Sequence, residues 1–108
     1  MIRKPLRVAA LGLLAASAAW APAHAQDAAT LNLRALAATC GNCHGTDGRA
    51  VAGSAVVSLA GLSKDHILTQ MKAFKSGSRP ATVMHQISKG YSDAQIESMA
   101  GYFAAIKP

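Results

Sequence analysis

Charged residues are scarce in this 108-residue sequence. They make up 15% of the chain, whereas 51% of the residues are hydrophobic. A disordered chain shows the opposite balance, so the composition excludes a disordered segment. The nine glycines and four prolines follow no period and no segment repeats, which excludes a fibrous protein. The length leaves room for one globular domain.

Basic residues outnumber acidic ones by 11 to 5, and part of this excess lies at the N-terminus. Residues 1–7 hold three basic residues and no acidic one, residues 8–19 are almost entirely apolar, and residues 23–25 read Ala-His-Ala. This order predicts a bacterial secretory signal peptide over residues 1–25. The apolar stretch is shorter than the roughly 20 residues that span a membrane, which favours cleavage over an uncleaved anchor. We therefore expect a periplasmic protein formed by residues 26–108.

Removing the predicted signal peptide changes the composition of the domain. It leaves 83 residues with eight basic and five acidic side chains, a net charge of +3. No second apolar stretch is long enough to span a membrane, so we expect no stable membrane insertion after cleavage. A chain this short often depends on a disulfide, a metal or a cofactor for stability.

The two cysteines stand in one motif, Cys40-Gly-Asn-Cys43-His44. C-x-x-C-H is the attachment signature of haem c, in which each thiol adds to one vinyl group and the histidine binds the iron. A redox disulfide would need a thioredoxin-like βαβ context, and a structural zinc site typically needs two such cysteine pairs. The motif therefore predicts one covalently bound haem c, with Cys40 and Cys43 as anchors and His44 as an iron ligand.

Three helices are predicted between long loops. Asp27 or Thr30 can cap a first helix, which is apolar around most of its circumference and is expected to be buried on more than one side. Ser63 opens a second helix that ends at residues 76–78, and Ser92 begins a capping box that opens the last. No segment resembles a strand. We expect an all-α fold of three main helices and long loops wrapped around one haem.

The sixth iron position has several candidate ligands. Met71 and Met99 lie in apolar helical stripes, where core packing is the better interpretation. His66 lies beside an aspartate in the first turn of its helix and is expected to be solvated. Met84 lies between two helices, in a segment that can reach the far face of the haem, and is the predicted ligand. Neighbours in an extended segment point to opposite sides, so His85 is expected near the surface.

These motifs resemble those of a class I cytochrome c over essentially the whole of the predicted domain. Residues 43–49, 58–61 and 84–93 are more narrowly similar to the cytochrome subunit of flavocytochrome c sulfide dehydrogenase. The resemblance implies a small class I cytochrome c fold in which the first and last helices cross. It also implies thioether bonds at Cys40 and Cys43. One C-x-x-C-H motif implies a single-haem form.

The same resemblance implies that His44 and Met84 are the axial ligands of the haem iron. Relatives commonly have prolines where this chain has Ser54 and Val57, so its loop is less constrained. A backbone carbonyl of that loop is still expected to orient the His44 ring.

The expected function is one-electron transfer in the periplasm, with no catalytic group in the chain itself. The resemblance implies redox partner proteins, among them a FAD-containing sulfide dehydrogenase subunit. The alternatives are a shuttle to a respiratory oxidase or reductase, and a haem enzyme or gas-binding protein with an open iron. The negative charge of a haem lowers the net charge of +3 that the domain carries. We therefore expect no nucleic-acid partner. Basic residues between the haem loop and the last helix form a solvated face or dock an acidic partner; they are Lys64, Lys72, Lys75, Arg79 and Lys89.

Overall fold

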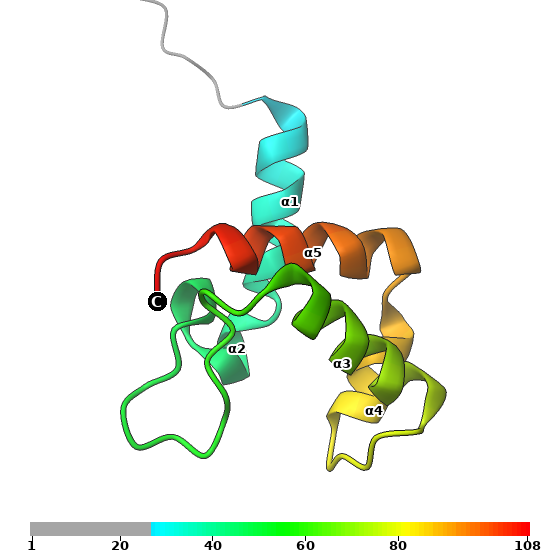
Figure 1. Cartoon of the computed structure of the whole chain (residues 1–108). Coiled ribbons are helices and arrows are strands. Elements are labelled where there is room, and N and C mark those ends of the chain that lie inside the picture. The colour runs from blue at the N-terminus through cyan, green and yellow to red at the C-terminus, as the bar shows by residue number, and fades with distance from the viewer. Residues whose placement is uncertain (1–26) are drawn as a thin grey trace, which may run out of the picture.

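The computed structural model describes residues 27–108. The predicted signal peptide, residues 1–25, lies outside this part of the chain. The elements, in order, are α1 (Ala28–Ala38), α2 (Gly41–His44), η1 (Thr46–Gly48), α3 (Lys64–Ser76), α4 (Met84–Ile87), η2 (Ser88–Gly90) and α5 (Asp93–Ala105). The described residues contain no strand, and the all-α prediction with three main helices is confirmed (Figure 1). Within the same residues, no helix has the length and apolar character that crossing a membrane requires.

The three long helices begin where their capping residues predict. The Asp27 carboxylate accepts the N–H of the third residue of α1, and the Ser63 hydroxyl does the same for α3. Ser92 and Gln95 form the full capping box of α5, each side chain accepting a backbone N–H of the other residue. Gly77 ends α3 in the left-handed conformation. Local hydrogen bonds therefore fix the ends of the elements that enclose the site.

The core lies where α1 and α3 pack against α5. Helices α1 and α5 cross, as the family resemblance implies (Figure 1). Small side chains permit a close approach of two helix axes. Ala37 of α1 and Ala100 of α5 are both buried in the apolar core. Four of the six residues in the buried apolar cluster belong to α5. The cluster consists of Ala37, Ile67, Ile96, Met99, Ala100 and Phe103.

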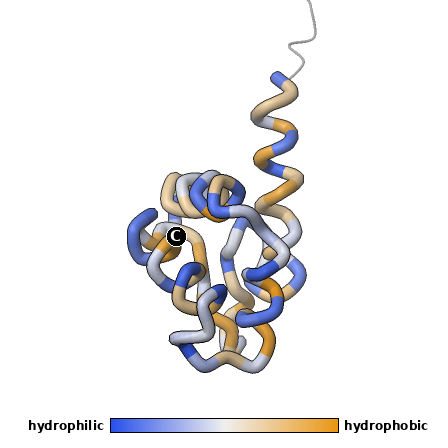
Figure 2. The backbone as a smooth tube through the Cα atoms, turned by 90° about the vertical axis from the view of Figure 1, so that its right-hand side faces the viewer, coloured by the Kyte–Doolittle hydropathy of each residue, from blue (hydrophilic) through white to orange (hydrophobic). Residues whose placement is uncertain are grey.

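Helix α1 is less buried than its sequence predicts. Ala37 is its one buried residue, and Leu31 is 50% exposed. Figure 2 shows the N-terminal part of α1 projecting away from the rest of the chain. Alanine and leucine are strong helix formers, so their distribution around α1 reflects helix propensity as well as burial. The expectation of burial on more than one side is therefore wrong.

Candidate functional site

The cysteine motif lies on a single helical turn directly after α1. The backbone N–H groups of Cys43 and His44 both donate to the Cys40 carbonyl, at 3.3 and 2.9 Å. Residues three and four apart share one side of a helix, so this turn presents both sulfurs and the imidazole in the same direction. Cys40 is half-buried and Cys43 is exposed, and their thiols are not bridged to each other.

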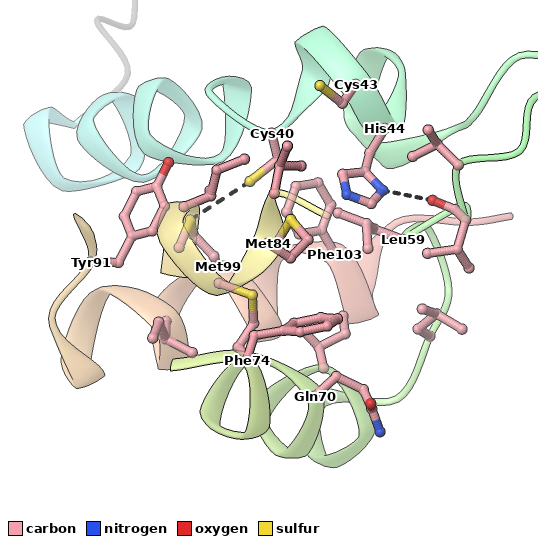
Figure 3. A pocket seen from close by; sticks show the side chains of 18 of the residues that line it. Cys40, Cys43, His44, Leu59, Gln70, Phe74, Met84, Tyr91, Met99 and Phe103 are labelled. Carbon is pink, nitrogen blue, oxygen red and sulfur yellow. Dashed lines mark hydrogen bonds between the residues drawn. The ribbon is translucent and has the colours of Figure 1, made fainter. Parts of the chain in front are cut away.

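These three residues line a cavity of about 470 Å³ between the main helices. Figure 3 shows it bordered by the α2 turn, α3, α4 and α5. Its walls are mainly apolar, and its size lies in the range of cofactor pockets. The arrangement fits a haem because thiols and an imidazole stand on one wall of an apolar space, and methionines stand on others. The lining includes Cys40, Cys43, His44, Leu59, Ile67, Met71, Phe74, Val83, Met84, Tyr91, Met99 and Phe103.

The His44 ring is oriented by a backbone carbonyl. Its Nδ1 lies 2.7 Å from the carbonyl oxygen of Val57 (Figure 3). A carbonyl oxygen can only accept, so Nδ1 carries the proton and Nε2 keeps a lone pair for a metal. Val57, which stands where relatives commonly have proline, therefore still provides the carbonyl that orients the His44 ring.

One residue, Gly48, anchors the loop that carries this carbonyl. The Gly48 carbonyl accepts the N–H groups of Leu59 and Ala60, at 2.7 and 3.1 Å, and the Ser58 hydroxyl at 2.8 Å. These three donors immediately follow Val57 in the chain. The loop is therefore held by hydrogen bonds at the point where it meets His44.

Three of the four methionines line the cavity, one each from α3, α4 and α5. Met84 is half-buried on α4, and Figure 3 shows it reaching into the same cavity as His44. Met71 lines the cavity from α3 and is also half-buried. Met99 is 3% exposed in the core, with its Sδ 3.9 Å from the Cys40 Sγ. The core-packing prediction for Met99 agrees with this burial, and Met84 stays the predicted ligand.

His85 is less exposed than predicted. It is half-buried, and its Nδ1 is buried with no hydrogen-bond partner among residues 27–108. Met84 and His85 are the first two residues of α4 and not part of an extended segment. Successive side chains on a helix are about 100° apart, so both can turn inward without pointing to opposite sides. His85 does not line the cavity, whereas the exposed His66 stands at its rim.

Sequence reasoning missed a set of polar contacts at the cavity edge. The Arg79 guanidinium lies 4.6 Å from the ring centroid of Phe74 and donates to the Gln70 side-chain oxygen. The hydroxyls of Thr39 and Tyr91 lie 2.7 Å apart, which links the end of α1 to the segment before α5. Arg79 brings a cation to a largely apolar wall, which suits the carboxylates of a haem. No periodicity marks these residues, so composition and spacing carried no signal for them.

The chemistry of Cys40 argues against a catalytic thiol. Burial raises the pKa of the Cys40 thiol, and a hydrogen bond from Thr39 opposes this only in part. A nucleophilic cysteine needs a lowered pKa and an electropositive setting. The site therefore favours a permanently bonded sulfur over a reactive one.

Comparison with known proteins gives three informative relatives, although no protein-family model matches the chain. The chain is 43% identical over 68 residues to the cytochrome subunit of sulfide dehydrogenase from Chlorobaculum tepidum, which covers 63% of this chain and 60% of that one. It is 35% identical over 109 residues to the thiosulfate dehydrogenase electron acceptor of Thiomonas intermedia, covering 99% and 46%. It is 34% identical over 70 residues to cytochrome c-554(548) of Halomonas halodenitrificans, covering 62% and 83%. The chain thus spans about half the length of the first two relatives.

An all-helical arrangement of residues 27–108 with a C-x-x-C-H turn on the wall of an apolar cavity defines a protein that binds haem covalently. The similarity to these relatives identifies the family within this class. The chain belongs to the class I cytochromes c. Its haem c is bound covalently.

Proposed function

We propose that this cytochrome accepts single electrons from a flavin-containing sulfide dehydrogenase subunit, in the periplasm. Cys40 and Cys43 are the thioether anchors, and His44 and Met84 are the axial ligands. The observation that carries the proposal is the relation between His44 and Met84, which line one cavity from separate elements. The 43% identity to a cytochrome subunit of sulfide dehydrogenase supports the choice of partner.

Ligation by both residues has a direct chemical consequence. When bound, the haem supplies a centre that takes up and releases one electron. If His44 and Met84 both bind the haem iron, they would leave no free position for sulfide, which could bind there only by displacing one of them. Sulfide oxidation to sulfur removes two electrons, and a flavin on a separate chain can take both and release them singly. The cytochrome then needs no catalytic group of its own.

The rim of the cavity supplies an apolar docking surface. Val56, Val57, Val83 and Ile87 line the cavity and remain exposed. Apolar residues near the centre of an interface with a polar rim are typical of protein complexes. The rim lies where electrons would cross, so we infer that the flavoprotein docks here.

Electrostatic steering is weaker than the number of basic residues implies. Lys75 is paired with Asp93, and Lys64 with Glu97. Arg79 lies over an aromatic ring. Of the five basic residues between the haem loop and the last helix, Lys72 and Lys89 have neither an ion pair nor an aromatic partner among residues 27–108, so within that group they are the cations left to attract an acidic partner. We therefore expect docking whose rate falls only modestly with added salt.

Export follows from the predicted signal peptide at residues 1–25. Intact-mass spectrometry of the protein purified from a periplasmic fraction is expected to give a chain that begins at Gln26 and carries one haem. A chain that retains residues 1–25 in that fraction would contradict cleavage. Free thiols at Cys40 and Cys43 in the exported protein would contradict covalent attachment.

Stopped-flow spectroscopy tests the proposed partner. Ferric cytochrome is mixed with sulfide, alone and with the FAD-containing subunit, and haem reduction is followed. We expect slow reduction by sulfide alone and rapid reduction when the flavoprotein is present. Fast, saturable reduction without a partner would indicate a haem enzyme with an open iron.

Paired variants test the docking surface in the same assay. Val83→Asp places a charge in the apolar rim and is expected to slow reduction by the flavoprotein. Val51→Asp is the matched control, because Val51 is exposed and does not line the cavity. Absence of any acceleration by the flavoprotein would favour a shuttle to a respiratory oxidase or reductase. A thiosulfate dehydrogenase is then the first donor to test, given the relative of that name.

A further inference from the structure

The segment that carries Met84 has little internal support. Residues 77–92 connect α3 to α5 and contain only α4 and η2, of four and three residues. A helix of one turn is not stable by itself, because its nucleation cost is not recovered. Val83, which precedes α4, provides no side-chain cap. The position of Met84 therefore depends on contacts that bind this segment to the rest of the molecule.

The start of the segment is bound to α3 through Arg79. Its backbone N–H donates to the Ala73 carbonyl at 3.1 Å, and its guanidinium lies over Phe74. Arg79 also lines the cavity. A change at Arg79 would thus alter the haem surroundings directly and could not isolate the effect of tethering.

The end of the segment is bound to α3 through Lys75. Its ammonium group donates to the Tyr91 carbonyl at 2.7 Å and to the Asp93 carboxylate at 2.8 Å. The Lys75 side chain is 32% exposed, so its stem is largely covered. Lys75 does not line the cavity. One residue of α3 therefore holds the last turn before α5 without touching the haem site.

We propose that Lys75 is a positioning residue for Met84. By fixing the end of the 77–92 segment on α3, Lys75 keeps Met84 at the cavity wall and lowers the population in which the sixth iron position is open. The inference rests on the proposed ligation by Met84. Lys75 lies nine positions before Met84 in the sequence and does not line the cavity.

The same pair of helices contains a matched control. Lys64 of α3 donates to Glu97 of α5 at 2.9 Å, and its side chain is 45% exposed. Among residues 27–108, Lys64 forms a hydrogen bond and an ion pair with Glu97 and none with the 77–92 segment. Lys64→Met and Lys75→Met each remove one α3–α5 ion pair and keep an unbranched apolar stem. Only Lys75→Met also releases the Tyr91 carbonyl.

Imidazole binding to the ferric holoprotein measures how often the sixth position is open, because added imidazole must displace the protein ligand. We expect Lys75→Met to bind imidazole about tenfold more tightly than the wild type, which is about 1.4 kcal/mol. Lys64→Met is expected to stay within about twofold, since its segment contacts are unchanged. Lys75→Arg keeps the charge and the donors, so it is expected to restore weak binding. Equal tightening in Lys75→Met and Lys64→Met, or none in either, would overturn the proposal.

A second pair of variants covers failure of Lys75→Met to fold. Asp93→Asn removes the ionic partner of Lys75 and is expected to shift imidazole affinity in the same direction by less. Glu97→Gln removes the ionic partner of Lys64 and is expected to leave the imidazole affinity unchanged. The same shift in both variants would contradict the positioning role.

Met84→Ala separates the two proposals. If Met84 is the ligand, this variant binds imidazole tightly and loses the red absorption band of methionine-ligated ferric haem. Unchanged affinity and an intact band in Met84→Ala would overturn the ligand assignment, and the role of Lys75 with it. Tight binding in Met84→Ala with wild-type affinity in Lys75→Met would overturn the positioning role alone.

Discussion

Substitution of Gly48 by alanine is expected to destabilise the protein, because the new side chain would be strained at the backbone and would meet packed neighbours. Gly48 is buried, with φ at +74°. A Cβ at this position would lie 2.8 Å from the Cδ1 of Phe103 and 2.9 Å from the Cβ of Leu59. Phe103 is 2% exposed, and a Cβ moves only with its backbone. Neither neighbour can therefore move aside cheaply.

Two costs add at Gly48. The left-handed conformation costs an alanine about 1–2 kcal/mol. Forcing an extra carbon into a packed core costs about 1–3 kcal/mol. The expected loss in the free energy of unfolding is thus about 2–5 kcal/mol, a large part of the stability of a small domain.

Two other glycines separate these costs. Gly53 has φ at +80° but open space around its Cβ position, so Gly53→Ala carries the conformational cost alone. Gly90 has neither a positive φ nor a close neighbour, so Gly90→Ala is expected to be nearly neutral. Urea denaturation of the three ferric holoproteins gives the three free energies. If Gly48→Ala costs no more than Gly53→Ala, the packing argument at Phe103 is wrong.

Three further predictions test other parts of the account. Ser92→Ala removes the hydroxyl that accepts the Gln95 N–H in the capping box and is expected to lower the free energy of unfolding by about 1 kcal/mol in urea denaturation; an unchanged midpoint would contradict the capping role. The Tyr102 hydroxyl donates to Asp47 at 2.8 Å, and this bond raises the pKa of Tyr102 above its ordinary value of 10.0. The hydrogen bond between Tyr102 and Asp47 therefore stabilises the folded protein fully below pH 10.0, and this contribution is lost as the pH rises through the higher pKa that Tyr102 has in the folded state. The stability difference between wild type and Tyr102→Phe is thus expected to disappear at high pH. Chain produced without the haem-attachment machinery is expected to be largely unfolded by circular dichroism, because the cofactor fills the core; a cooperatively melting apoprotein would contradict this.

Elements with strong local signals could be predicted from the sequence. Ser63 and Ser92 precede regular apolar stripes, so both helices begin at the predicted residues. The C-x-x-C-H motif specified the cofactor because its chemistry requires that spacing. Short-range hydrogen bonds and periodicity are sufficient for such features.

Features set by tertiary contacts could not be predicted in the same way. The single turn of α4 has no periodicity, so the segment was expected to be extended and His85 was placed near the surface. The sequence places Lys75 among basic residues that form a solvated face or dock an acidic partner, whereas two acceptors 16 and 18 positions away hold it in the structure. The apolar composition of helix α1 favours burial, but composition does not reveal which elements pack against the helix. In each case the deciding partner is distant in sequence.

The absorption spectrum of the ferric protein identifies the residue that binds the sixth position of the haem iron. Wild type, Met84→Ala and Met71→Ala are compared as holoproteins, because both methionines line the cavity. We expect the red methionine-to-iron band in wild type and in Met71→Ala, where only packing worth about 2–5 kcal/mol is lost. We expect no such band, and a lower reduction potential, in Met84→Ala. Loss of the band in Met71→Ala with its retention in Met84→Ala would show that Met84 is not the ligand.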